Sequence, residues 1–146
     1  MESANLNKIP KMFWSRLQRN EIIIDKGKTY LPCMVLGKKR IGIKLSFVTD
    51  TRPISKIVTF IKESDLFICE GTYGDENHMG KAIRNKHMTF SEAAELALSG
   101  DVQELLLTHF SPAMINPEEY KDRAKGIFKN TIIGFDRFIK TLSFKE

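Results

Sequence analysis

Three residues whose side chains can bind metals or transfer protons stand at the ends of short apolar segments in this chain. Asp50 follows the segment LSFV, Glu70 ends DLFICE, and His109 ends ELLLTH. A carboxylate together with an imidazole suits zinc or another borderline transition metal. Each residue also has a simpler interpretation. Asp50 could cap the following helix, Glu70 could cap a turn, and His109 could be satisfied within a turn.

His87 is a fourth candidate, because it lies just before Thr89 and Glu92, which have the spacing of a capping box. Its ring is therefore expected near a helix N-terminus, where backbone N–H groups favour anions such as phosphate. A histidine that titrates near neutral pH can give a proton to a leaving oxygen. Glu70 could orient such a histidine by accepting a hydrogen bond. The alternative is a surface histidine, which is what we expect of His78.

The elements that must position these residues are predicted by the apolar spacing from about residue 41 onward. Apolar runs predict strands over residues 41–48, 65–70, 102–109, 130–136 and 137–144. Helical spacing and capping residues predict helices from Pro53 to about Lys62, within 71–87, from Thr89 to Gly100, and over 116–128. This alternation is typical of an α/β fold whose early strands are parallel. Ligands bind such sheets at the carboxyl ends of the strands, so we expect Asp50, Glu70 and His109 to share one site.

The first forty residues have a different pattern. A helix is expected after Pro10, with Met12, Phe13, Trp14 and Leu17 on one apolar face. A hairpin is expected over residues 22–31, followed by a loop at Gly37 and the basic run over 38–40.

Length and composition indicate one folded domain. The chain has 146 residues, of which 42% are hydrophobic and 28% charged. We expect a single domain over 1–146, with a helix and hairpin over 1–40 and an α/β core over 41–146. The net charge of +5 permits a nucleic-acid partner without requiring one.

The sequence also gives expectations about location. No apolar run approaches the roughly 20 residues that a membrane-spanning helix needs. The opening MESANLNKIPK lacks the apolar segment of a secretory signal. Cys33 and Cys69 are far apart and are expected to be reduced. We therefore expect a cytoplasmic protein with no membrane partner.

Four segments of the chain carry a resemblance to a known family. They are TDTRP (49–53), DLFICEGTYGDE (65–76), KHMTFSEAAELA (86–97) and ELLLTHFSP (104–112). In this order they resemble the C-terminal half of ribonuclease Z, the tRNA 3′-processing endonucleases of the metallo-β-lactamase superfamily. IPKMFWSRLQRNE (9–21) resembles the segment that precedes this half. The resemblance implies one half of an αβ/βα sandwich. It would have a mixed sheet with helices mainly on one face, and an apolar face left exposed.

The resemblance also implies roles for individual residues. Asp50 matches the aspartate that bridges two zinc ions, and His109 matches the late histidine ligand. His87 matches the histidine of the family's His-x-Thr motif, which assists the leaving group. Glu70 matches a recurring strand-end glutamate, here assigned a catalytic part. The residues expected to contact the substrate are Thr89, Arg52 and Ser111.

The implied reaction is zinc-dependent removal of the 3′ trailer from a tRNA precursor, which leaves a 3′-hydroxyl on the tRNA. The family's main metal motif, His-x-His-x-Asp-His, is absent, since the first histidine of this chain is His78. Each zinc needs at least three protein ligands, and Asp50 with His109 gives two ligands for two ions. Thr49 and Ala113 also depart from the glycine and arginine that are usual at their positions.

This shortfall of ligands predicts that the chain alone is inactive. The expected partners are precursor tRNA and an N-terminal half of the fold or a second subunit, with a homodimer as the complete protein. One alternative is a catalytically incomplete remnant of the same fold that binds tRNA or dimerises. Another is an unrelated α/β domain that binds a small phosphorylated ligand.

Overall fold

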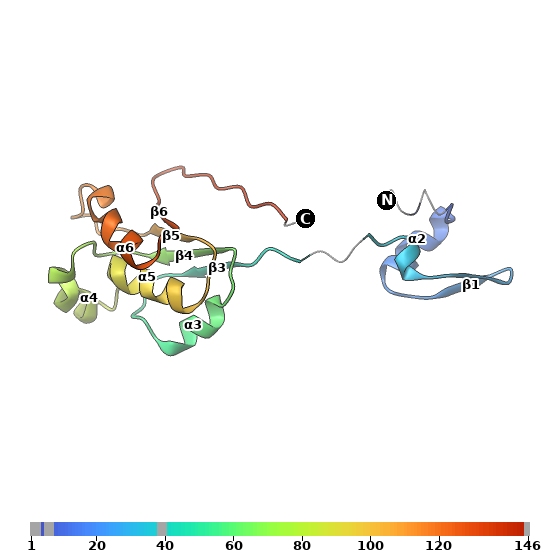
Figure 1. The fold of residues 1–146 in the computed structure, drawn as a ribbon, viewed down its shortest axis with the longest axis horizontal. Helices are drawn as coiled ribbons and strands as arrows, with labels where there is room; N and C mark the ends of the chain where they lie inside the picture. Colours follow the sequence, from blue (N-terminus) through green and yellow to red (C-terminus); the bar gives the residue numbers. More distant parts are fainter. Residues whose placement is uncertain (1–3, 5–7, 38–40, 145–146) are drawn as a thin grey trace. The chain divides into compact units, whose positions relative to one another are not determined.

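The computed structural model describes residues 4, 8–37 and 41–144. These residues form two compact units that divide between Ile41 and Gly42 (Figure 1). The division falls where the sequence pattern changes. Whether the whole chain acts as one domain stays a prediction. The loop expected at the basic run over 38–40 lies outside the described residues.

The first unit has the expected helix and hairpin. Its elements are α2 (Lys11–Gln18), β1 (Ile23–Asp25), β2 (Lys28–Tyr30) and the short 3-10 helix η1 (Pro32–Met34). β1 and β2 pair antiparallel. Phe13 and Leu17 are buried, and the ring centroids of Phe13 and Tyr30 lie 5.1 Å apart. Met12 is 77% exposed, so the buried face of α2 is narrower than predicted.

The second unit contains a four-stranded sheet. Its strands are β3 (Leu45–Val48), β4 (Leu66–Glu70), β5 (Leu105–Thr108) and β6 (Thr131–Ile133), in the order β3-β4-β5-β6. All three pairings are parallel, so the expectation of a mixed sheet is wrong for the residues that the structure describes. Every connection between neighbouring strands contains a helix, and a strand reached by such a crossover runs parallel to the one before it. The strand predicted over 137–144 is also wrong, because these residues form no strand.

Helices and 3-10 helices connect the strands. They are α3 (Ser55–Ile61), η2 (Glu76–His78), α4 (Met79–Asn85), α5 (Phe90–Ser99), η3 (Pro117–Tyr120) and α6 (Lys121–Ile127). α5 begins at the predicted capping box. Thr89 Oγ1 accepts from the Glu92 N–H at 3.2 Å, and Glu92 Oε2 accepts from the Thr89 N–H at 2.9 Å. α3 begins two residues later than predicted, since Ile54 and not Asp50 is its N-cap.

The two faces of the sheet differ in burial. Phe67, Cys69, Leu105 and Leu107 point to one side and share a core cluster with residues of α3, α5 and α6. The register aligns the apolar side chains of the other face, which lie outside that cluster: Phe47, Ile68, Leu106 and Ile132. Phe47 is 57% exposed. Leu106 is buried, and Ile68 and Ile132 are half-buried. Among the described residues, the exposed apolar face that the resemblance implies is therefore limited to β3.

The two faces should respond differently to truncation. We expect Phe47→Ala to cost less than about 1 kcal/mol of unfolding free energy, because most of this ring is already in water. Phe67→Ala, on the neighbouring strand and fully buried, should cost about 3–5 kcal/mol. Urea unfolding of the full chain measures both. Equal losses would mean that the face carrying Phe47 is buried in the isolated chain.

The two cysteines also differ in environment. Burial, and next the neighbouring Glu70 carboxylate, raise the pKa of the Cys69 thiol, whereas Cys33 is exposed. Since the thiolate is the reactive form, iodoacetamide should label the folded chain at Cys33 and reach Cys69 only after unfolding. Mass spectrometry of the alkylated protein checks this. A folded Cys33→Ser variant that still takes up the label would contradict it.

Candidate metal and catalytic site

Parallel strands bring the predicted residues to one edge of the sheet. Asp50 lies two residues past the end of β3, Glu70 is the last residue of β4, and His109 follows β5 directly. These three strands are neighbours, so their carboxyl ends meet. His87 reaches the same place from the turn between α4 and α5.

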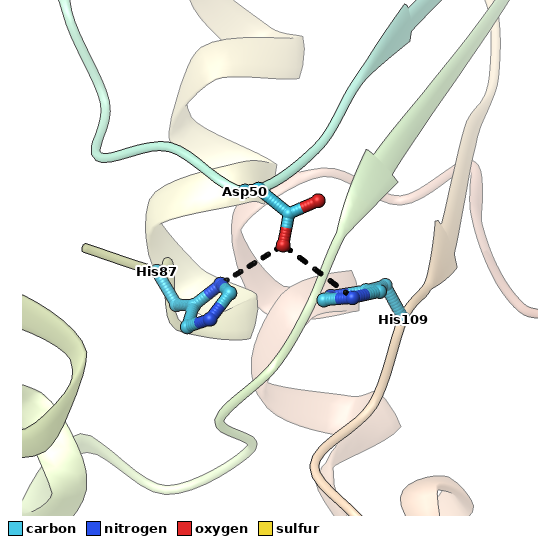
Figure 2. A group of neighbouring side chains, drawn as sticks. All are labelled: Asp50, His87 and His109. Atoms are coloured by element: carbon cyan, nitrogen blue, oxygen red, sulfur yellow. Dashed lines mark ion pairs between the residues drawn. The ribbon is translucent and has the colours of Figure 1, made fainter. Parts of the chain in front are cut away.

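The Asp50 carboxylate lies between two histidine rings (Figure 2). Its Oδ1 is 3.5 Å from Nε2 of His109 and 4.0 Å from Nδ1 of His87. The two ring centroids are 5.5 Å apart. One ligand atom from each of the three residues lies within 4.8 Å of the others. The arrangement gathers one oxygen and two nitrogen donors around a small volume.

The backbone at both strand ends has an unusual conformation. Asp50 has φ +53° and His109 has φ +54°, in the left-handed region that most residues avoid. Aspartate tolerates this region better than most side chains do. The Asp50 carboxylate does not cap α3, which has no side-chain cap, and accepts instead from the Thr49 hydroxyl at 3.2 Å. The capping role considered for Asp50 is therefore wrong.

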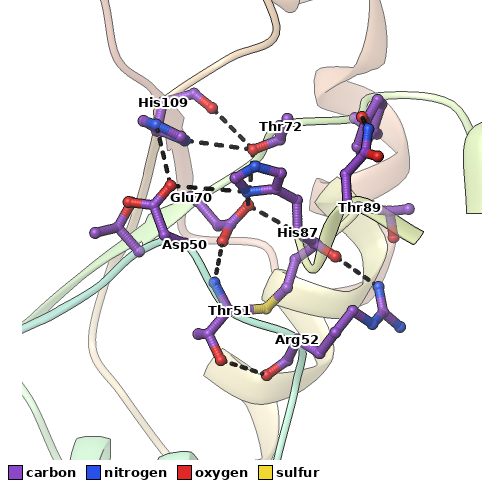
Figure 3. Close-up of polar contacts among 12 residues, drawn as sticks. Asp50, Thr51, Arg52, Glu70, Thr72, His87, Thr89 and His109 are labelled. Atoms are coloured by element: carbon purple, nitrogen blue, oxygen red, sulfur yellow. Dashed lines mark hydrogen bonds and ion pairs between the residues drawn. The ribbon is translucent and has the colours of Figure 1, made fainter. Parts of the chain in front are cut away.

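Glu70 is a buried carboxylate at the centre of the site (Figure 3). Its Oε1 accepts from the Thr51 N–H at 2.8 Å. Its Oε2 lies 2.9 Å from Nδ1 of His87 and accepts from the Met88 N–H at 3.1 Å and the Thr72 hydroxyl at 2.7 Å. Glu70 thus makes the contact that orienting a histidine requires. Its hydrogen bonds with Thr51 and Met88 also connect the turn after β3 to the turn before α5.

Arg52 makes a second connection between the same two turns. Its guanidinium forms an ion pair with both carboxylate oxygens of Glu92 and donates to the His87 carbonyl at 2.7 Å. The Arg52 side chain is 26% exposed. These contacts give Arg52 a structural part, and its predicted contact with substrate stays a prediction.

Thr89 and Ser111 were also predicted to contact substrate. Thr89 is fully buried, and its hydroxyl accepts the capping hydrogen bond of α5. Ser111 lies in the turn after β5, where its N–H donates to the Thr72 carbonyl at 3.1 Å. Both roles stay predictions, as do those of Asp50, Glu70, His87 and His109.

Sequence reasoning missed two members of the site. Thr72 donates to Glu70, and its hydroxyl lies 3.4 Å from Nδ1 of His109. Its position two residues past a strand-end carboxylate was a signal for it. Glu92 was recognised only as a helix cap, and its pairing with Arg52, forty residues away, has no local signal.

The donor types fit zinc, but the number of donors is short. A separation of 3.5 Å between Asp50 Oδ1 and His109 Nε2 is close to the roughly 3.3 Å expected for two ligands of one tetrahedral ion. Nδ1 of His87 is already bonded to Glu70, so only Nε2 of that ring is free for another partner. Among the described residues, Asp50, His87 and His109 are the one group of three that could hold a metal ion.

Two curated proteins that this chain matches along its whole length share one name, although no protein-family model matches it. A ribonuclease Z of Clostridium beijerinckii is 58% identical over 148 residues, covering 100% of this chain and 48% of its own length. A ribonuclease Z of Clostridium perfringens is 57% identical over 146 residues, covering 100% and 46%. The chain is homologous to part of ribonuclease Z. It spans about half the length of the curated relatives that it matches.

Two solved structures support the fold of this chain. The short form of human tRNase Z superposes with a TM-score of 0.56 at 25% identity, covering 70% of this chain and 34% of that chain. The metallo-β-lactamase fold protein YhfI from Bacillus subtilis gives a TM-score of 0.53 at 25% identity, covering 62% and 36%. The expected α/β part of a metallo-β-lactamase fold is confirmed. In the part of the chain that the structure describes, no helix has the length and apolar character to span a membrane.

Proposed function

We propose that this chain supplies the C-terminal part of a ribonuclease Z that removes the 3′ trailer from tRNA precursors in the cytoplasm. The observation that carries the proposal is the Asp50 carboxylate between His109 and His87, at 3.5 and 4.0 Å. The names of relatives at 57–58% identity point to the same activity.

Each residue has a distinct part in the proposed reaction. Asp50 and His109 would hold zinc, which when bound activates water and neutralises the charge that develops on the phosphate. With Glu70 ionised, Nδ1 of His87 carries a proton and donates to it, which leaves Nε2 for the substrate. A protonated Nε2 can give its proton to the 3′-oxygen as the bond from that oxygen to phosphorus breaks. The tRNA then ends in a 3′-hydroxyl and the trailer begins with a 5′-phosphate.

The remaining ligands must come from outside this chain. Two zinc ions need more donors than Asp50, His87 and His109 provide. The exposed apolar sheet face around Phe47 gives a partner a surface to cover. We propose that an N-terminal half of the same fold covers it, within a complete protein that dimerises.

The test combines this chain with the N-terminal half of the Clostridium beijerinckii ribonuclease Z, zinc and a tRNA precursor. We expect cleavage by the mixture and none by either half alone. A second protein joins the same two halves in one polypeptide, so that activity no longer depends on the halves binding each other. An inactive joined protein, under conditions where the intact relative cleaves, would refute the proposal. Cleavage by the chain alone would refute the inference that this chain has too few metal ligands for activity.

A non-catalytic role in tRNA binding is the alternative, and the net charge of +5 favours it. Under this alternative the chain binds tRNA with an affinity that falls steeply as salt rises. The joined protein would then bind tRNA and fail to cleave it.

A further inference from the structure

A cavity of about 190 Å³ lies beside the candidate site. Its walls come from the turn after β4, from α4 with the residue before it, from the turn after β5, and from η3. The lining residues that matter here are Thr72, Tyr73, His78, Lys81, Ser111 and Tyr120. Neither the metal cluster nor the buried glutamate uses this space.

The cavity and the candidate site share one residue, Thr72. The Thr72 hydroxyl lies 2.7 Å from Glu70 Oε2 and 3.2 Å from the His109 carbonyl oxygen. The Thr72 carbonyl accepts from the Ser111 N–H, which fixes the two cavity walls to each other. A ligand in the cavity would therefore lie next to the residue that contacts both Glu70 and His109.

Aromatic rings give the cavity its character. The rings of Tyr73 and His78 pack edge to face with centroids 5.9 Å apart. Asn85 donates to the Tyr73 hydroxyl at 2.7 Å, which holds that ring in place. Tyr120 packs so closely on Gly74 that a Cβ there would lie 2.3 Å from the ring. Fixed aromatic walls of this kind suit a flat ring.

The charge of the lining is positive. Lys81 is exposed on α4 and forms no ion pair within residues 8–37 and 41–144. No carboxylate belongs to the lining. The lining thus combines surfaces for stacking with a cation for a phosphate.

We propose that this cavity binds one unstacked nucleotide of single-stranded RNA next to the bond that is cut. The base lies among Tyr73, His78 and Tyr120, and the phosphate contacts Lys81. A cavity of about 190 Å³ has room for one base and not for a base pair. The position of the nucleotide relative to the bond rests on the proposed function, whereas its binding does not.

The test is a titration of the full chain with cytidine 5′-monophosphate and uridine 5′-monophosphate, followed by amide NMR. We expect the largest shifts in residues 72–74, 78–81 and 111–114. Inorganic phosphate and ribose 5-phosphate serve as probes without a base and should bind more weakly by about fivefold or more, because they cannot stack. Equal binding of inorganic phosphate would overturn the stacking part. Shifts centred on Asp50 and His109, or none up to the highest concentration at which the chain stays folded, would overturn the proposal.

Two variants sharpen the assignment. Lys81→Ala should weaken nucleotide binding several-fold and remove most of its salt dependence, whereas Lys56→Ala, an exposed lysine on α3, should change neither. His78→Ala should weaken the binding of both nucleotides by about fivefold or more and leave the binding of inorganic phosphate unchanged. An unchanged affinity in both cavity variants would contradict the proposal.

The two proposals fail in different ways. Nucleotide binding in the cavity with no cleavage by the joined protein would refute the proposed function and leave the cavity assigned. Cleavage by the joined protein, with no nucleotide bound in the cavity, would refute nucleotide binding at this cavity and leave the proposed function standing.

Discussion

Replacing Asp50 with asparagine should reduce tRNA-precursor cleavage by the joined halves more than about a hundredfold. Loss of a residue that only supports a metal ligand already costs about 10–100-fold, and Asp50 is a proposed ligand itself. An amide of the same shape removes the charge that a bridging carboxylate supplies. Cleavage rates and the zinc content of the purified protein measure the effect, and both should fall together.

The fold should survive this substitution. The Asp50 side chain is 62% exposed, and asparagine tolerates the left-handed backbone that this position has at φ +53°. The unfolding free energy should therefore change by less than about 0.5 kcal/mol. If Asp50→Asn loses activity because the protein unfolds, then Asp50 has a structural role and its proposed role as a metal ligand is not supported.

Asp101 offers a matched control. It is an exposed aspartate with φ +49°, just after α5, and it takes no part in the metal cluster. Asp101→Asn makes the same chemical change in nearly the same backbone conformation. We expect unchanged cleavage and zinc content. An Asp50→Asn protein that behaves like Asp101→Asn would refute the proposed role of Asp50 as a metal ligand.

The sequence predicted the residues that strand ends bring together. Asp50, Glu70 and His109 follow apolar segments that became β3, β4 and β5. Their meeting follows from one rule, because parallel neighbours present their carboxyl ends at the same edge. His87 was found through the capping box beside it, which is also a local signal.

Contacts between distant turns left no such signal. The pairing of Arg52 with Glu92 depends on how the turn after β3 lies against the start of α5, and each residue alone has an ordinary local explanation. In the C-terminal segment, by contrast, a local signal predicted an element that does not form. Its apolar residues suggested a strand, but Ile139 is 88% exposed, because a strand forms only where a neighbouring edge accepts its hydrogen bonds.

The Glu70→Gln substitution should destabilise the isolated chain and change the proton position on His87. Both carboxylate oxygens accept backbone N–H groups, Oε1 from Thr51 and Oε2 from Met88. Whichever oxygen the amide group replaces, a donor faces a donor in a buried place. An unsatisfied buried group of this kind costs about 1–3 kcal/mol, which urea unfolding of the chain alone can measure.

The proton on His87 provides a readout that a loss of packing would not change. With Glu70 ionised, the neutral ring should carry its proton on Nδ1, which the ¹⁵N shifts of the imidazole report. In Glu70→Gln the side chain can donate to Nδ1, so the population with the proton on Nε2 should rise. Cleavage by the joined halves should then fall by about 10–100-fold, as expected when the group that orients a catalytic histidine is lost.

Glu95→Gln is the control for both measurements. Glu95 is exposed on α5, so its amide remains in water, and neither the unfolding free energy nor the His87 shifts should change. If Glu70→Gln destabilises the chain but leaves the His87 tautomer unchanged, then Glu70 only holds the two turns together. If the tautomer shifts and cleavage persists at the unmodified rate, proton donation by His87 does not depend on its hydrogen bond to Glu70. Only a joint change in tautomer and rate supports the proposed Glu70–His87 pair.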